Sequence, residues 1–332
     1  MQLLEMQGTD PYTNLATEDY ILSNYCADDY LLLWRNDNTI VVGLHQNTRE
    51  EINAAFAEQN NIRVVRRRTG GGAVYHDLGN LNFSFITEAR DASRLTMERF
   101  TLPVVRALAA MGLNAEASGR NDILVNGSKI SGNAQCLHKE RILHHGTLLF
   151  DADLSVAGKA LQVKPEKFVS KSVKSVRARI GNIKDFLRPA MRMEDFSENL
   201  AQRLLRDNFA QTGQSGVLEL TAHDLRAIAE LRENKYATWE WNYGRSPAFN
   251  FRNIQKYAGG FLEVLLDVEE GRIKACKFFG DFMALRPAAE VAEKLLGSKY
   301  TRAGAAAVLE QMPLEEFFGG ICQNEILDCL FN

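Results

Sequence analysis

Three consecutive glycines, Gly70-Gly71-Gly72, constrain the fold of this chain more than any other feature, and they follow a short apolar strand signal at Ile62–Val65. Glycine carries no Cβ atom, so such a stretch can adopt positive φ angles and lets a ligand approach the backbone closely. This freedom costs conformational entropy, and a simple turn does not need three glycines. The run matches neither a Walker A sequence nor the dinucleotide spacing Gly-x-Gly-x-x-Gly. We therefore expect a ligand-facing loop, with a flexible turn as the alternative.

The bulk properties are those of an ordinary globular protein. A length of 332 residues favours two domains, and 45% hydrophobic content supplies a core. A net charge of -3 gives no global field that would recruit nucleic acid. The five cysteines are scattered without a Cys-x-x-Cys pair, which argues against a disulfide framework or zinc site and fits a reducing compartment. With no signal peptide or membrane-length apolar run in the sequence, we expect a cytoplasmic protein.

Strand and helix signals occur in a mixed order, which favours an α+β fold over a doubly wound sheet. The expected strands are Tyr30–Trp34, Thr39–Gly43, Ile62–Val65, Leu81–Ile86, Ile123–Val125, Lys129–Ser131 and Leu143–Phe150. The first two are expected to pair as a hairpin across Arg35-Asn36-Asp37-Asn38, and Asn126-Gly127 to form a second hairpin turn. The expected amphipathic helices are Arg49–Gln59, a helix from Phe100 that stops at Gly112, and Asp195–Phe209.

The composition changes between Trp239 and Phe251, where an aromatic stretch is followed by Arg245-Ser246-Pro247. We place a domain boundary here, between a large domain at 1–245 and a small accessory domain at 251–332. The accessory domain is expected to begin with a hairpin of Gly259–Val268 and Ile273–Phe279, followed by short helices.

Basic residues precede the glycine run. If the strand continues, Arg66 and Arg68 share a face and Arg67 points the other way, where its guanidinium could make forked contacts to a phosphate. A solvated strand end is the alternative for this triplet.

Two further clusters carry side chains suited to phosphate chemistry. Lys129 follows the tight Asn126-Gly127 turn, and within ten residues lie Asp122, able to hold a hard cation, and Arg120, able to hold a carboxylate or phosphate. The tandem His144-His145 pair invites a metal interpretation, but consecutive strand residues face opposite sides and do not easily chelate one ion. Thr147 is the better ligand candidate in that cluster.

In this order and spacing, four motifs resemble those of lipoate–protein ligases. They are Arg67-x-x-Gly70-Gly71-Gly72-Ala73-Val74-Tyr75-His76-Asp77, Gly119-Arg120-Asn121-Asp122, Lys129-x-Ser131-Gly132 and His144-His145-Gly146-Thr147-Leu148-Leu149. The resemblance covers essentially the whole chain. It implies the biotin/lipoate ligase fold, with a large mixed or antiparallel sheet in the catalytic domain and a small C-terminal α+β domain.

The resemblance also implies the reaction. Free lipoate and Mg-ATP would give lipoyl-AMP and pyrophosphate, and a lysine of an acceptor protein would then take the lipoyl group. The acceptor would be the lipoyl domain of a 2-oxoacid dehydrogenase E2 component or the glycine-cleavage H protein, and the sequence favours neither. A monomer, acting without nucleic acid or membrane, is the working expectation.

The same resemblance assigns roles to residues. Lys129 would be the catalytic residue, and the ATP and lipoyl-AMP site would comprise Arg67, Gly72, Ala73, Val74, Tyr75, Arg120, Lys129 and Thr147. Loop support would come from Gly70, Gly71, His76 and Asp77, and magnesium would bind Asp122. The segment Ser172–Arg179 would form a second adenylate loop, and Lys171, Lys174, Arg177 and Arg179 a basic docking surface. Val74, Leu44 and Phe83 would wall an acyl tunnel.

Three alternatives remain open. An ATP-independent octanoyl or lipoyl transferase would need a cysteine nucleophile, and Cys136 lies seven residues after Lys129. A non-catalytic lipoyl-binding protein could retain the same fold. A biotin ligase would carry arginine and glycine interleaved in its loop, which Arg68-Thr69-Gly70-Gly71-Gly72 does not resemble.

Overall fold

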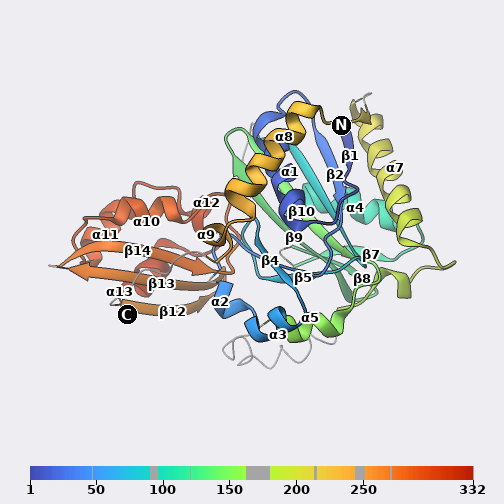
Figure 1. The fold of residues 1–332 in the computed structure, drawn as a ribbon. Coiled ribbons are helices and arrows are strands. Elements are labelled where there is room, and N and C mark those ends of the chain that lie inside the picture. The colour runs from blue at the N-terminus through green and yellow to red at the C-terminus, as the bar shows by residue number, and fades with distance from the viewer. Residues whose placement is uncertain are drawn as a thin grey trace.

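The computed structural model describes residues 1–46, 48–89, 96–119, 121–161, 180–212, 215–243, 251–269 and 271–331. Figure 1 shows two bodies, a large one built around a long twisted sheet and a smaller one formed by the C-terminal strands and helices. The mixed sheets with helices on their faces confirm the predicted α+β class.

Within the described residues, the large sheet has eight strands in the order β11-β1-β2-β6-β10-β9-β8-β7. Their bounds are β1 (Gln2–Glu5), β2 (Tyr30–Trp34), β6 (Asn80–Glu88), β7 (Ala115–Ser118), β8 (Asp122–Val125), β9 (Ser128–His138), β10 (Arg141–Leu149) and β11 (Gly216–Val217). β1 runs parallel to both of its neighbours, and the other pairs are antiparallel. The β8–β9 hairpin turns at Asn126 and Gly127, whose φ angles of 50° and 80° confirm the predicted turn.

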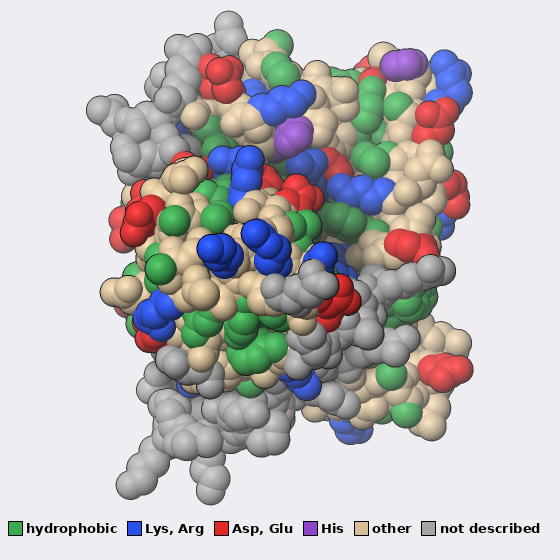
Figure 2. All heavy atoms as spheres, turned by 90° about the vertical axis from the view of Figure 1, so that its left-hand side faces the viewer, with side chains coloured by type: hydrophobic (Ala, Val, Ile, Leu, Met, Phe, Trp, Pro, Cys, Tyr) green, Lys and Arg blue, Asp and Glu red, His purple; other side chains and the backbone are tan. Residues whose placement is uncertain are grey.

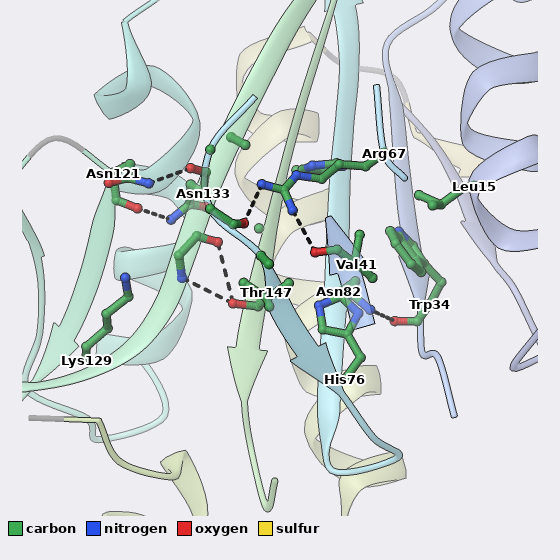
Figure 3. A pocket seen from close by; sticks show the side chains of 18 residues that line it. Leu15, Trp34, Val41, Arg67, His76, Asn82, Asn121, Lys129, Asn133 and Thr147 are labelled. Atoms are coloured by element: carbon green, nitrogen blue, oxygen red, sulfur yellow. Dashed lines mark hydrogen bonds between the residues drawn. The ribbon is translucent and has the colours of Figure 1, made fainter. Parts of the chain in front are cut away.

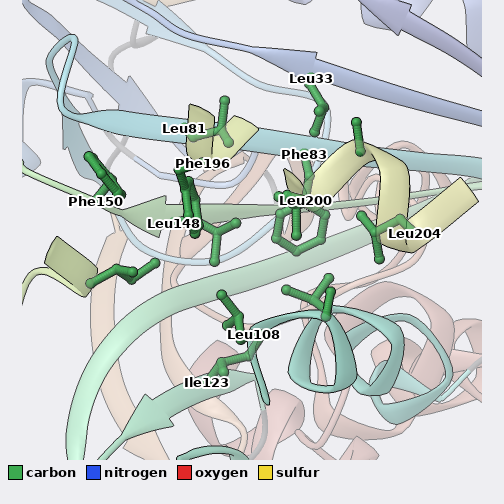
Figure 4. Packing of buried hydrophobic residues seen from close by; sticks show 14 of the residues in the cluster. Leu33, Leu81, Phe83, Leu108, Ile123, Leu148, Phe150, Phe196, Leu200 and Leu204 are labelled. Carbon is green, nitrogen blue, oxygen red and sulfur yellow. The ribbon is translucent and has the colours of Figure 1, made fainter. Parts of the chain in front are cut away.

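Helices cover both faces of this sheet (Figure 1). On one face, α4 (Met97–Ala109) and α7 (Met193–Thr212) pack over a hydrophobic core that includes Phe83, Leu148 and Phe196 (Figure 4). On the other face lie α1 (Pro11–Asn24) and α8 (Ala222–Leu231). The remaining short elements are α5 (Leu154–Ala160), the 3₁₀ turn η3 (Ile183–Asp185), the π-helical turn η4 (Arg232–Tyr236) and α9 (Trp239–Asn242).

A second, small sheet in the order β4-β3-β5 carries the glycine run. Its strands are β3 (Thr39–Val42), β4 (Arg63–Arg66) and β5 (Val74–His76), and the glycines connect β4 to β5. The predicted hairpin of Tyr30–Trp34 with Thr39–Gly43 is therefore wrong, because β2 and β3 belong to different sheets. The side-chain amide of Asn14 donates to Arg35 O at 2.8 Å and to Asn36 Oδ1 at 3.0 Å, and so holds the connection against α1 where the chain changes sheets.

The predicted helix Arg49–Gln59 is divided in two. α2 (Thr48–Glu51) ends before Ile52, and α3 (Ala54–Gln59) begins after Asn53, whose side chain accepts from Phe56 N at 3.2 Å. Asparagine caps a helix in this way because its side-chain oxygen satisfies a free backbone N–H. The break places Ile52 in a bridge with Leu161.

The C-terminal unit consists of a three-stranded sheet with helices on one face. Its elements are β12 (Phe251–Tyr257), β13 (Gly260–Glu269), β14 (Arg272–Gly280), α10 (Ala289–Leu295), α11 (Arg302–Leu309), α12 (Leu314–Phe318) and α13 (Gln323–Phe331). A separate hydrophobic core lies between this sheet and its helices. The unit contacts the large body near the glycine run, where Gly280 N donates to His45 O at 2.7 Å and the Phe282 ring stacks on His45 with centroids 4.8 Å apart.

Gly146, in the middle of β10, is a site where added volume is expected to destabilise the fold. A Cβ atom there would lie 2.2 Å from Asn133 Oδ1 and 2.5 Å from Phe83 Cζ. Gly146→Ala should therefore lower the free energy of unfolding by about 1–3 kcal/mol, measured by urea denaturation. The matched control is Gly158→Ala in α5, where no atom lies within 4 Å of the added carbon. That change should be neutral or stabilising by up to about 1 kcal/mol, and equal destabilisation by both would contradict the packing account.

Candidate active site

A cavity of about 210 Å³ lies between the glycine run and strands β9 and β10 (Figure 3). It is lined by Leu15, Trp34, Val41, Arg67, Gly71, Gly72, Ala73, Val74, His76, Asn82, Asn121, Lys129, Gly132, Asn133, Ala134, His145, Gly146 and Thr147. Figure 3 shows Lys129 on one side, Trp34 and Leu15 on the other, and Thr147 between them. The cavity thus has a polar end and an apolar end, drawn from segments far apart in the sequence.

Glycine suits each of the three positions for a different reason. Gly71 has a φ of 89°, which L side chains rarely adopt. At Gly70 a Cβ atom would lie 2.7 Å from Phe282 O of the C-terminal unit. A Cβ atom at Gly72 would meet no described atom within 4 Å, so the protein itself does not exclude a side chain there. The open backbone of Gly72 faces the cavity, which is where a ligand would use the missing side chain.

Arg67 holds the shape of this loop from inside the protein. Its side chain donates to Gly70 O at 2.6 Å, to Gly72 O at 2.9 Å and to Val41 O at 3.2 Å. Arg67 is only 6% exposed, and burial lowers its pKa to about 10. Because these contacts are to backbone carbonyls on both sides of the loop, the guanidinium fixes the spacing between the glycine run and β3.

The neighbouring arginines are structural rather than solvated. Arg66 is buried and donates to Gly43 O and Gln46 O, each at 2.7 Å. Arg68 forms an ion pair with the buried Asp19 of α1. Burial by itself raises the pKa of Asp19, but the positive charges and hydrogen bonds of Arg68 and Lys235 together outweigh burial and lower this pKa overall. The alternative of a solvated strand end is therefore wrong for this triplet.

A hydrogen-bonded relay connects Arg67 to a buried carboxylate. Arg67 Nε donates to Thr69 Oγ1 at 2.9 Å, Thr69 Oγ1 lies 2.8 Å from His145 Nε2, and His145 Nδ1 lies 2.9 Å from Glu18 Oε1. The Glu18 carboxylate accepts from His145 Nδ1–H, and in this neutral tautomer His145 Nε2 accepts from the Thr69 hydroxyl. Glu18, 2% exposed, offsets the buried positive charge of Arg67.

The charge of Glu18 is therefore expected to stabilise the loop. Glu18→Gln should lower the free energy of unfolding by about 3 kcal/mol, because removing the Glu18 carboxylate charge leaves the Arg67 guanidinium buried without a compensating negative charge. Asp207→Asn is the control, since Asp207 pairs with Arg106 at the surface with side chains 41% and 53% exposed. Such an exposed pair contributes at most about 1 kcal/mol. Urea denaturation of both variants measures the difference, and equal effects would contradict the buried relay.

The two consecutive histidines face opposite sides of β10, as alternation along a strand predicts. His145 lines the cavity, whereas His144 is stacked on Phe100 in the core with centroids 4.8 Å apart. Burial lowers the pKa of His144 to about 3, so this ring is neutral. Within the described residues, no group of three or more His, Cys, Asp or Glu side chains is placed to hold a metal ion.

At the polar end, Lys129 and Asp122 form an ion pair of 2.7 Å. Both side chains are about one-third exposed, at 35% and 32%. Thr147 Oγ1 accepts from Gly132 N at 3.1 Å, and the Lys129 side chain passes over the same glycine. The Lys129 side chain and the Thr147 hydroxyl line the same cavity as the open backbone of Gly72, and the cationic Nζ suits a ligand carrying negative charge.

Two asparagines that the sequence analysis did not assign to the site hold this end together. Asn121 Nδ2 donates to Asn133 O at 2.8 Å, and Asn133 Nδ2 donates to Asn121 O at 3.0 Å (Figure 3). Both line the cavity. The Asn121-Asp122 pair in the sequence pointed to this end of the site. Asn133, the hydrogen-bond partner of Asn121, lies twelve residues further along the chain on β9, and no short motif links the two asparagines.

Other predicted residues lie elsewhere. The Tyr75 side chain is absent from the residues lining the cavity, and its hydroxyl donates to Asn38 Oδ1 at 3.0 Å. Asp77 braces the turn into β6 by accepting from Gly79 N at 2.9 Å and Asp153 N at 2.7 Å. Arg120 and the segment Ser172–Arg179, with Lys171 and Lys174, are outside the described residues.

Of the three residues expected to wall an acyl tunnel, Val74 lines this cavity, whereas Phe83 and Leu44 do not. Phe83 is fully buried in the core on the other face of the large sheet. Leu44 lines a different cavity, between the glycine-run sheet and the C-terminal unit. Trp34, Leu15 and Val41 form the apolar end instead.

Cys136 lacks the properties of a nucleophile. Its side chain is 5% exposed, and it lies in the hydrophobic cluster beneath α1 rather than in the cavity. Burial raises the pKa of the thiol to about 12, so the thiolate is scarce at neutral pH.

Comparison with known proteins identifies the family. The model of the lipoyl protein ligase A/B catalytic domain matches residues 10–205, and that of the bacterial lipoate protein ligase C-terminus matches residues 246–330. Lipoate-protein ligase LplJ of Bacillus subtilis (strain 168) is 44% identical over 323 residues, covering 97% of each chain. Lipoate–protein ligase 1 of Staphylococcus aureus (strain Mu50) is 42% identical over 320 residues, covering 96% of each.

Solved structures agree on the fold. P. falciparum LipL1 in complex with lipoate superposes with a TM-score of 0.80 at 24% identity, covering 98% of this chain and 97% of that one. The bipartite ligase of Thermoplasma acidophilum, described with its E2 lipoyl domain, gives 0.64 at 32% identity over 75% of this chain and 98% of that one. Lipoate-protein ligase A bound with ATP gives 0.60 at 30% identity over 73% and 97%. Matched over nearly its full length, this chain belongs to the lipoate–protein ligase family and is a ligase.

Proposed function

We propose that this enzyme activates free lipoate with Mg-ATP to form lipoyl-AMP and pyrophosphate, and then transfers the lipoyl group to a lysine of an acceptor protein. The observation that carries the proposal is the cavity with Lys129 at its polar end and Leu15, Trp34 and Val41 at its apolar end. A mixed anhydride of a long acyl chain and AMP needs both kinds of surface. Relatives described with lipoate and with ATP support the same pair of substrates.

The chemistry of the first step requires no enzyme nucleophile. A carboxylate oxygen of lipoate attacks the α-phosphorus of ATP, the bond to the pyrophosphate breaks, and negative charge increases on the α-phosphate oxygens. We assign Lys129 Nζ to those oxygens, because a positioned cation stabilises charge that develops in the transition state. In the second step the acceptor amine attacks the acyl carbon and AMP leaves, with Lys129 at the carbonyl oxygen. Holding the reactants in line would supply much of the remaining rate.

The residues around the glycine run would bind the acyl-adenylate. Gly72 and Ala73 would lie against the acyl-adenylate, Val74 against the acyl chain, and Thr147 against the adenylate. We assign Arg67 as a contact to the phosphate, because its guanidinium lies at the loop that would hold it. Most of the hydrogen bonds that Arg67 donates go to backbone carbonyls and fix the shape of this loop. We keep Arg120 as an adenylate ligand and Tyr75 as a backbone contact only.

Asp122 is the candidate magnesium ligand. Its carboxylate is of the ligand class that magnesium prefers, and the partly exposed group is ion-paired with Lys129, which lines the cavity. Magnesium sites in nucleotide enzymes commonly use one or two carboxylates together with phosphate and water oxygens, so a single carboxylate fits. The ion would neutralise phosphate charge, while the protein residues named above bind and orient the reactants.

For the acceptor we propose a lipoyl domain of an E2 component or an H protein. A relative described together with its E2 lipoyl domain supports this class. Lys and Arg side chains gather in the middle of the face that includes the C-terminal unit (Figure 2), which would favour an acidic partner. We further propose that the enzyme acts in the cytoplasm as two domains, 1–245 and 251–332. Among the described helices, none is long and apolar enough to cross a membrane.

The test is an assay of purified protein with free lipoate, ATP and an acceptor domain lacking lipoate. Lipoyl acceptor and AMP should form together, and both should depend on ATP. Lipoyl or octanoyl transfer without ATP would contradict the ligase and favour the transferase alternative. Cys136→Ser separates the two further, since a ligase should remain active and a cysteine-dependent transferase should not.

A further inference from the structure

A chain of side-chain amides determines which nitrogen of His76 carries the proton. Asn14 Nδ2 donates to the carbonyls of Gly8 and Arg35, at 3.2 and 2.8 Å, so this atom is a nitrogen. Its third neighbour, Asn36 Oδ1 at 3.0 Å, must then be an oxygen. The other end of that amide, Asn36 Nδ2, lies 3.3 Å from His76 Nδ1 and can only donate to it. His76 Nδ1 is therefore an acceptor, and the neutral ring carries its proton on Nε2.

This Nε2–H is a buried donor without a protein partner among the described residues. His76 is 3% exposed and lines the cavity. A buried donor left unpaired costs free energy, and a polar group in that state in a binding cavity points to a ligand or water. The fold maintains the donor by dedicating two asparagines to its tautomer.

His76 belongs to the apolar end of the cavity. Its ring lies 6.4 Å from the Trp34 ring in an edge-to-face arrangement, and Figure 3 places it beside Asn82, across Thr147 from Lys129. The other polar groups here have protein partners. Trp34 Nε1 donates to Ser84 Oγ, and Asn82 Nδ2 donates to Trp34 O.

We propose that His76 is a specificity-determining residue whose Nε2–H donates a hydrogen bond to a dithiolane sulfur of the bound lipoyl group. The proposal rests on the function proposed above, which places the carboxyl carbon at Lys129 and the far end of the acyl chain beside Trp34. The only heteroatoms at that end of lipoate are its two ring sulfurs, which are weak acceptors. Octanoate presents only carbon and hydrogen there, so it displaces any water from His76 and leaves the donor unpaired.

The experiment compares lipoate with octanoate as substrates for acid-dependent pyrophosphate exchange into ATP, with kcat/KM measured for each. His76→Phe keeps a planar ring and removes the donor. It should lower the preference for lipoate over octanoate by about tenfold, mainly through KM for lipoate, while octanoate-dependent exchange is retained. His76→Gln, which keeps a donor, should recover most of the preference. Val74→Ala on the same face of β5 is the matched control and should slow both acids without changing their ratio.

The outcomes separate this proposal from the function on which it rests. If His76→Phe folds and leaves the ratio of kcat/KM for lipoate to kcat/KM for octanoate unchanged, including by lowering both values equally, the role of His76 is overturned. That result would favour bound water at Nε2. Absence of exchange with either acid in the wild-type protein would instead contradict the ligase reaction. Should His76→Phe fail to fold, His76→Asn replaces it, because its amide is too short to reach the Nε2 position and the same loss of preference is expected.

Discussion

Lys129→Ala is expected to lower the rate of lipoyl-AMP formation by about 100- to 1,000-fold, the loss found when one preorganised donor to developing charge is removed. Lys129 Nζ is the cation placed at the polar end of the cavity, 2.7 Å from Asp122 and over Gly132. Alanine removes that charge and leaves the neighbouring carboxylate to repel the incoming phosphates. Lipoate-dependent pyrophosphate exchange measures the change.

The control for Lys129 is Lys184→Ala. Lys184 also pairs with a carboxylate, that of Asp151, but its side chain is 46% exposed and lies outside the cavity. Its loss should leave exchange unchanged. Exchange at the wild-type rate in a folded Lys129→Ala protein would contradict the role of this lysine.

Local signals in the sequence predicted those parts of the fold that are set by local chemistry. The Asn126-Gly127 turn formed because asparagine and glycine tolerate positive φ, and α4 ends at Ala109, three residues before Gly112 with its φ of 87°. The hairpin predicted for Tyr30–Trp34 failed because its turn residues instead bond to Asn14 of α1, a contact across twenty-one residues or more. Turn composition indicates that the chain bends, but not which sheet receives the next strand.

The site followed a similar division. Consecutive motif positions placed Gly72, Val74, Lys129 and Thr147 around one cavity, as expected. Strand alternation correctly separated His144 from His145. Among the residues missed were Glu18 and Asn133, whose partners lie 127 and 12 residues away. Buried polar relays of this kind depend on tertiary contacts and leave no periodic trace in a single sequence.

Arg67→Lys is expected to reduce lipoyl-AMP formation by about 100-fold, since a displacement of about 1 Å at a reacting group can have an effect of this size. Lysine has a single terminal nitrogen and cannot reproduce the planar fork that holds Gly70 O, Gly72 O and Val41 O together. The glycine run should therefore lose its spacing from β3 even though the charge is retained.

Two measurements separate this effect from unfolding. Urea denaturation reports the stability of the variant, and pyrophosphate exchange reports its active site at temperatures where it is folded. Arg106→Lys, whose side chain is 53% exposed on α4, is the control and should change neither. A folded Arg67→Lys protein with wild-type exchange would mean that the loop does not depend on the forked contacts.

Lipoate-dependent exchange of labelled pyrophosphate into ATP by the purified wild-type protein tests the central claim most directly. Reversible formation of lipoyl-AMP moves the label into ATP only when the enzyme itself joins lipoate to AMP. The account predicts exchange that requires lipoate and is lost in Lys129→Ala. A folded protein that binds lipoate but shows no exchange would contradict the ligase reaction and favour a lipoyl-binding protein of the same fold.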